Sequence, residues 1–109
     1  MDEHEFRKHS DAALESLRRR LLELSDAFDF EVEGEGEKLE LEFDDENETR
    51  FVISPNTAAR QIWISALSTS FKLSWSESAT AFVMEKTGET LTTVMSRILT
   101  QQLGSAVTV

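Results

Sequence analysis

Two segments of this chain alternate between apolar and acidic residues, and that alternation limits the fold more than any other feature. The first segment covers residues 28–33 and the second lies within residues 38–44. In an extended strand successive side chains point to opposite faces, so the apolar residues of each segment share one face and the acids share the other. The sequence therefore predicts two adjacent strands that bury one face and show a layer of carboxylates to water.

Acidic residues are concentrated in the first half of the chain. Eighteen of the 21 acids lie in residues 1–50, and the whole chain has a formal net charge of −10. Such a surface repels nucleic acid and anionic lipid, and it attracts cations or basic protein surfaces. Because crowded like charges reduce stability, we expect part of this surface to serve binding; the alternative is a solvated face that keeps the protein soluble.

Composition excludes several kinds of protein and site. A chain of 109 residues with 39% hydrophobic content is expected to form one domain with one modest core, residues 1–109. Since cysteine is absent, disulfides, thiolate metal sites and cysteine nucleophiles are excluded, and a metal would be held mainly by oxygen. No stretch approaches the roughly 20 apolar residues of a membrane span, and no export or transit signal is recognisable.

The remaining pattern predicts a helix towards each end of the chain. Apolar residues recur at helical spacing over residues 6–24 and 90–103, and Gly104 is placed to end the second helix. Pro55 is expected to stop the third strand. The expected strands are 28–33, 38–44, 50–54, 60–66, 70–75 and 79–85, with a turn at 34–36 and a tail, 105–109, that packs on the helices.

This order of elements predicts an α+β two-layer sandwich. About six strands joined by short turns form a mainly antiparallel sheet, and both helices cover one of its faces. The other face meets water. That open face is expected to carry Glu40, Glu42 and Asp44 on early strands, and Gln61 and Trp63 on a later strand.

Carboxylates near the end of the first helix and on the first strand are candidate ligands for a hard cation such as Mg²⁺, Ca²⁺ or iron. Their spacing matches neither an EF-hand loop nor a di-iron bundle, so binding is expected to be weak, multiple and exposed. His4 and His9 lie about 140° apart around a helix, so they are expected to be ordinary surface histidines that do not chelate one ion together. The alternative is that His4, near Asp2, Glu3 and Glu5, joins a cation site. The candidate ligands are Glu15, Glu23, Asp26, Asp29 and Glu31.

Trp63 is the main candidate for a protein contact. If the neighbouring Ile62 and Ile64 face the helices, Trp63 lies on the open face, where an exposed tryptophan is a plausible interface anchor. The alternative is a tryptophan buried by neighbouring side chains, as expected for Trp75. The serines form no nucleophile elbow and the glycines no phosphate loop, so a conventional active site is not expected.

Several segments in order resemble the frataxin family of the bacterial type. No single motif is long, but their order and spacing span nearly the whole chain. They are the acidic first helix; Ile53, Ser54, Pro55, Asn56; Gln61, Ile62, Trp63, Ile64, Ser65; residues 71–75; Thr87, Gly88, Glu89, Thr90; and Thr100, Gln101, Gln102.

This resemblance implies a monomeric iron-binding regulator or iron chaperone of iron–sulfur cluster assembly in the bacterial cytoplasm. Its partners would be a cysteine desulfurase and the scaffold protein on which clusters form. The family's acidic ridge matches the five candidate ligands given above. Its partner-facing sheet positions match Ser54, Asn56, Gln61, Trp63 and Lys72.

The sequence also departs from the family pattern. Arg18, Arg19 and Arg20 stand in a helical stretch where the family usually carries acids, and Arg19 is placed four residues before Glu23, where the two can pair. High iron capacity is therefore in question. Ser54 replaces an asparagine found in many members. Two other functions stay open: a ferroxidase that stores oxidised iron, and an acidic interaction module that binds no metal.

Overall fold

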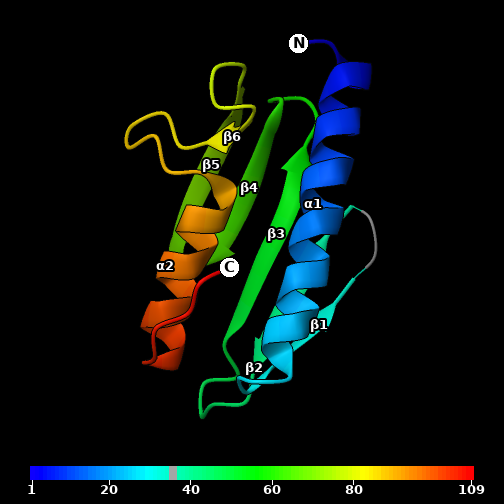
Figure 1. Ribbon diagram of the computed structural model, residues 1–109. Coiled ribbons are helices and arrows are strands. Elements are labelled where there is room, and N and C mark those ends of the chain that lie inside the picture. Colours follow the sequence, from blue (N-terminus) through cyan, green and yellow to red (C-terminus); the bar gives the residue numbers. More distant parts are fainter. Residues whose placement is uncertain (35–36) are drawn as a thin grey trace.

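Two helices lie on the same face of a six-stranded sheet (Figure 1). The computed structural model describes residues 1–34 and 37–109, so Glu35 and Gly36 of the expected turn lie outside the described residues. Each strand pairs antiparallel with the next one in the chain, in the order β1 to β6. The elements are α1 (Glu3–Ser25), β1 (Phe30–Glu33), β2 (Leu39–Phe43), β3 (Arg50–Asn56), β4 (Gln61–Ala66), β5 (Thr69–Ser76), β6 (Ala81–Val83) and α2 (Leu91–Leu103).

The predicted α+β two-layer sandwich is confirmed, and the expected sides of the early strands are confirmed with it. Leu39, Leu41 and Phe43 of β2 are buried under the helices, while the acids between them face the open side. Phe30 of β1 is buried in the same core. Alternation along β2 therefore identified its buried side chains correctly, whereas Val32 of β1 is only half-buried.

The first strand begins two residues later than predicted. The backbone N–H groups of Ala27 and Phe28 both donate to the Leu24 carbonyl at 3.0 Å, so these residues continue the end of α1 as a turn. Phe28 is therefore only partly buried and lies before the strand. The last strand is also shorter than predicted, because Met84 and Gly88 are held in a turn by a backbone hydrogen bond of 2.8 Å.

Pro55 does not stop the third strand, which corrects the sequence prediction. β3 runs on to Asn56, and Pro55 lies opposite Ile62 of β4. Proline has no backbone N–H to donate to a neighbouring strand, so it is tolerated where the strand has no partner on that side. That condition holds here, since the pairing of β2 with β3 ends at Leu39 and Ile53.

Side-chain caps start both helices, and the predicted end of α2 at Gly104 is confirmed. The Asp2 carboxylate accepts a hydrogen bond of 2.7 Å from the Glu5 N–H and so caps the start of α1. Thr90 caps α2, and Gly104 ends it with a φ of 71°, a left-handed conformation that favours glycine. Both helices bury a single apolar stripe against the sheet.

The C-terminal tail returns to the helices, as predicted, and lies between them in Figure 1. Val107 is buried, and the Thr100 hydroxyl accepts a hydrogen bond of 3.0 Å from its N–H. The Val109 N–H donates to the Ser96 hydroxyl at 2.9 Å. On the other side, the Arg20 guanidinium donates to the Thr108 carbonyl at 2.8 Å. The tail thus connects α1 with α2.

The turn before α2 is held by an ion pair with two hydrogen bonds. Arg97 on α2 donates to both carboxylate oxygens of Glu89, at 2.9 and 3.0 Å, and its guanidinium lies 5.5 Å from the Phe71 ring centroid. Hydrogen bonding from Arg97 holds the pKa of Glu89 below the ordinary value of 4.5. The ionised carboxylate is thus favoured by folding.

This pairing makes part of the stability depend on pH. Because the folded-state pKa of Glu89 is lowered, its contribution is fully present above about pH 4.5 and is lost as pH falls through the lower, folded-state value. We expect Glu89→Gln to reduce the free energy of unfolding by about 0.5–1 kcal/mol at pH 7 and to have a smaller effect at pH 3. Urea unfolding at both pH values measures this, with the exposed Glu46→Gln as control. An equal loss at both pH values would contradict the assignment.

The turn between β4 and β5 is conformationally strained. Leu67 and Ser68 form its two-residue loop with φ values of 53° and 58°, which is the left-handed region where glycine and asparagine are preferred. Leu67 is partly buried against the core, which offsets its strain; Ser68 is exposed.

We expect Ser68→Gly to raise the free energy of unfolding by about 1 kcal/mol, because glycine adopts positive φ without steric cost. Urea unfolding followed by circular dichroism measures the change. Ser70→Gly is the matched control: Ser70 lies on β5 in extended conformation, where glycine is expected to lower stability. A Ser68→Gly variant less stable than the parent would show that the turn is not strained.

Candidate functional site

The open face of the sheet brings together most of the residues singled out in the sequence. The strand register places Glu31 opposite Glu42, and Glu42 opposite Arg50, across β1, β2 and β3. Further along the sheet, Ser54 lies opposite Trp63, and Trp63 lies opposite Lys72. One face therefore carries acids over β1 and β2 and an exposed tryptophan over β4.

Three glutamates form the carboxylate cluster: Glu31 and Glu33 of β1 and Glu42 of β2. One carboxylate oxygen from each lies within 4.8 Å of the others, and the cluster is the one group of three potential metal ligands found among the described residues. It is open to solvent and has no buried wall, since Glu31 and Glu33 are exposed and Glu42 is half-buried. Three hard oxygen donors at this spacing suit a hydrated cation held weakly.

Basic residues border the carboxylate cluster. The Arg50 guanidinium donates to Glu42 at 2.7 Å, and Lys38 lies 3.0 Å from Glu40. Hydrogen bonding from Lys38 lowers the pKa of Glu40 from its ordinary value. Hydrogen bonds from the side chain and backbone of Thr49 do the same for the pKa of Asp45 in the next turn. Glu40 and Glu42 are therefore paired with bases, whereas neither Glu31 nor Glu33 has a salt bridge within the described part of the chain.

The acids of the helix are placed differently from those of the strands. Glu15 accepts a hydrogen bond of 3.1 Å from Arg19 and lies 3.7 Å from Arg18. Glu23 pairs with Arg20 at 3.1 Å. The predicted pair of Arg19 with Glu23 was therefore wrong: Arg19 pairs with Glu15, and Arg20 takes Glu23. Both pairs have a spacing of three or four residues, which makes side chains neighbours on a helix. The charges of Glu15 and Glu23 are largely matched.

Asp26 and Asp29 lie between the helix and the sheet. Asp26 is the C-terminal cap of α1 and is exposed. Asp29 lines a polar hollow of about 540 Å³ together with Glu31, Glu42 and Asp44. Glu31 therefore shares its surroundings with the acids of β2 rather than with Glu15 and Glu23 of the helix.

Trp63 lies on the open face, as predicted from the alternation of β4. Its side chain is 36% exposed, whereas Ile62 and Ile64 are buried. The indole N–H donates to the Gln61 side chain at 2.8 Å, and the Lys72 ammonium lies 4.8 Å from the centroid of the indole ring. Such a contact favours a fixed ring orientation. The tryptophan is thus both exposed and oriented.

Comparison with known proteins identifies the family. A family model described as the frataxin-like domain matches residues 1–105. This chain belongs to the frataxin-like domain family. A solved structure of frataxin from Psychromonas ingrahamii is similar over 99% of this chain and 97% of that chain, with 21% identity and a TM-score of 0.81, which shows a shared fold. A search among curated proteins finds no match.

Membership of the frataxin-like family supports a role in iron handling and iron–sulfur metabolism. It also supports interaction with proteins of iron–sulfur assembly in general terms. Over residues 1–34 and 37–109, neither helix combines the length and apolar content needed to cross a bilayer.

Sequence reasoning missed two residues that support Trp63. The Gln61 amide donates to the Ser74 hydroxyl at 3.2 Å, and that hydroxyl donates to the Glu85 carboxylate at 3.4 Å. This chain of hydrogen bonds orients Gln61, which in turn orients the indole. Recognising it required the register of β4 with β5, in which Gln61 lies opposite Ser74. The sequence carries no separate signal for it.

The other predicted partner-facing residues have mixed surroundings. Ser54 is half-buried beside Trp63, whereas the Asn56 side chain accepts a hydrogen bond of 2.9 Å from the Ala59 N–H and so shapes the turn after β3. The histidines lie apart from the carboxylate cluster. His4 is exposed on α1, and His9 stacks on Trp75 with ring centroids 3.9 Å apart.

Proposed function

We propose that this frataxin-like protein is a non-catalytic, iron-binding regulator of iron–sulfur cluster assembly that docks on a cysteine desulfurase and on the cluster scaffold protein. The observation that carries the proposal is the open face of the sheet, which combines the carboxylate cluster with the oriented, exposed Trp63. Because the helices cover the other face of the sheet, they leave both the carboxylate cluster and Trp63 accessible.

Iron binding is proposed to centre on the carboxylate cluster with Asp29 and Asp26 beside it. Carboxylate oxygens are suitable ligands for iron, and the exposed position predicts weak binding with several water ligands retained. Glu15 and Glu23 remain candidates from the family pattern, but the arginines that pair with them lower the local negative potential. We therefore assign them a smaller share of the affinity.

Docking is proposed to use charge for encounter and Trp63 for specificity. The net charge of −10 attracts a basic partner surface and raises the rate of encounter. Trp63 then supplies a large contact area whose orientation is set by Gln61 and Lys72, so little side-chain entropy is lost on binding. Ser54 and Asn56 border this contact on β3.

Neutralising the carboxylate cluster tests the iron site. We expect Glu31→Gln, Glu33→Gln and Glu42→Gln together to weaken Fe²⁺ binding about tenfold or more, because three charged ligands become neutral. Amide NMR under anaerobic Fe²⁺ titration measures both the affinity and the residues affected. Glu3→Gln, Glu15→Gln and Glu23→Gln together, all on α1, change the net charge by the same amount and should have a smaller effect.

A second control separates specific binding from general attraction. Glu5→Gln, Asp11→Asn and Glu77→Gln remove three charges from exposed positions distant in sequence from the cluster. Equal weakening by all three triple variants would show that iron is only attracted by net charge. Stronger weakening by the helix variant would move the site to the helix acids. A variant that loses iron binding but still binds its protein partners with unchanged affinity would favour the metal-independent interaction module.

Replacing Trp63 tests the docking surface. We expect Trp63→Ala to weaken binding to the scaffold protein at least tenfold, as for a buried interface anchor, and to change unfolding free energy little because the side chain is on the surface. Isothermal titration with scaffold and, separately, with desulfurase measures this. Ser65→Ala, on the same face of β4, is the control. Unchanged scaffold affinity in Trp63→Ala would exclude the open face as the docking surface.

A further inference from the structure

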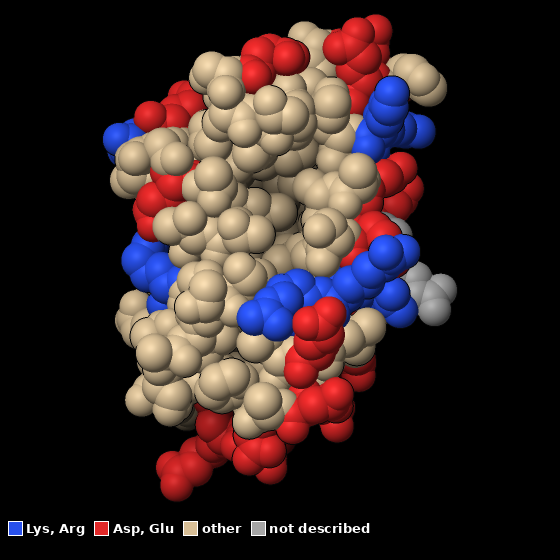
Figure 2. All heavy atoms as spheres, viewed as in Figure 1, with Lys and Arg blue, Asp and Glu red and all other residues tan. Residues whose placement is uncertain are grey.

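A groove runs between the two helices on the side of the molecule opposite to the open sheet face. Figure 2 shows the surface hollowed there, in a region where acidic and basic side chains are sparse. The groove has a volume of about 610 Å³ and is lined by α1, the start of α2, the β5–β6 region and Val109 of the tail. The proposed function does not use it.

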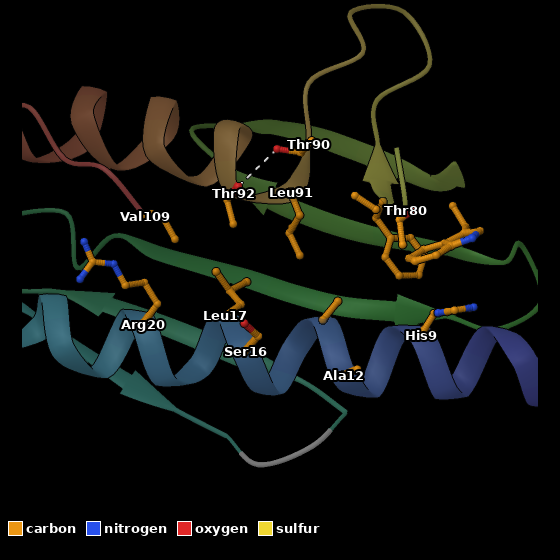
Figure 3. Close-up of a pocket in the computed structure, with 14 residues that line it drawn as sticks. His9, Ala12, Ser16, Leu17, Arg20, Thr80, Thr90, Leu91, Thr92 and Val109 are labelled. Atoms are coloured by element: carbon orange, nitrogen blue, oxygen red, sulfur yellow. Dashed lines mark hydrogen bonds between the residues drawn. The ribbon is translucent and has the colours of Figure 1, made fainter. Parts of the chain in front are cut away.

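The groove stays open because small side chains face it. From α1 these are Ala12, Ala13 and Ser16, and from α2 they include Thr92. Ala12, Ser16 and Thr92 can be followed in Figure 3. The tail reaches the groove only with Val109. Neither helix therefore fills the space between them, and apolar surface remains exposed to water.

The two ends of the groove differ in chemistry. At one end His9 stacks on Trp75, and Phe82 packs against the same indole. At the other end lies Arg20, eleven residues later on α1 and thus about 16 Å away along the helix axis. Leu17 and Leu91 form apolar lining between the two ends (Figure 3). The groove is therefore open and mainly apolar, with serine and threonine side chains in its lining and an arginine at one end.

We propose that this groove binds a medium-chain aliphatic carboxylate, with its acyl chain between the helices and its carboxylate on the Arg20 guanidinium. The volume lies within the range of small-molecule sites, and a mainly apolar lining that includes some polar side chains is typical of them. A single guanidinium at the end of an apolar channel matches a ligand with one terminal anionic group.

Arg20 has hydrogen-bonding capacity left for such a ligand. One of its terminal nitrogens donates to the Thr108 carbonyl and the other to Glu23, out of five N–H donors in a guanidinium. The Glu23 side chain is 70% exposed, so its contact with Arg20 is a surface ion pair of small energy. Glu23 is therefore a weak competitor for the ligand carboxylate, and its removal should strengthen binding.

Titration of the full chain with sodium octanoate tests the proposal, with amide NMR as the readout and octanol as the neutral probe. We expect octanoate to shift the amides of Ala13, Ser16 and Thr92 in a saturable way, while the amides of the open sheet face stay unchanged. Octanol should bind about tenfold more weakly, since it lacks the charge that Arg20 contacts.

Matched variants separate the guanidinium from general charge. Arg20→Met should weaken octanoate binding about tenfold, whereas Arg19→Met, the same change on an exposed neighbour that does not line the groove, should leave it unchanged. Glu23→Gln should strengthen binding, and Glu15→Gln should not. Since Arg20→Met also removes the Thr108 contact, Ala12→Phe, which fills the groove and leaves Arg20 in place, should abolish binding by itself.

Two results would overturn the proposal. The first is equal affinity for octanoate and octanol that is unaffected by Arg20→Met, because the groove would then bind apolar chains without recognising a carboxylate. The second is a set of NMR shifts located on the open sheet face, or no saturable shift in the groove. Circular dichroism and urea unfolding of each variant verify that binding is compared between folded proteins.

Discussion

The structure depends on the burial of one face of a six-stranded sheet under two helices. Each strand has two faces, so the burial of Leu41, Ile53 and Ile62 turns their neighbours along each strand towards solvent. The same constraint that builds the core thus sets out the open face residue by residue. Trp63 is exposed because its two neighbours are buried, and Glu42 faces outwards for the same reason. Core and candidate site are two consequences of one alternation.

Charge is arranged differently on the two layers. On α1 the acids Glu15 and Glu23 are paired with arginines three or four residues away, which leaves little unbalanced charge there. On the sheet, Arg50 and Lys38 pair with the acids of β2, but the acids of β1 have no salt bridge among the described residues. The negative potential that a cation would meet is therefore concentrated at one edge of the sheet. By balancing the acids of α1, the helix arginines leave the unpaired negative charge on β1.

Sequence patterns predicted the elements, the buried faces and the family, because these follow from periodicity, caps and local order. They did not predict contacts that depend on how elements are placed against each other. The proximity of Glu31 to Glu42 required the register of β1 with β2, and the support of Gln61 by Ser74 required that of β4 with β5. The stacking of His9 on Trp75 joins a helix to a strand 66 positions later, for which no local pattern exists. The prediction that Pro55 stops β3 was wrong because the sequence does not show where the pairing of β3 with β2 ends.

The position of β1 at the edge of the sheet gives its acids a further consequence. An edge strand exposes unpaired backbone N–H and carbonyl groups, which invite pairing with a strand of another molecule. β1 is four residues long and carries two exposed glutamates, and β6 at the opposite edge is three residues long. Two molecules that approached edge to edge through β1 would bring four carboxylates into contact. Independently of any cation, the charges of these acids disfavour edge-to-edge pairing of two sheets.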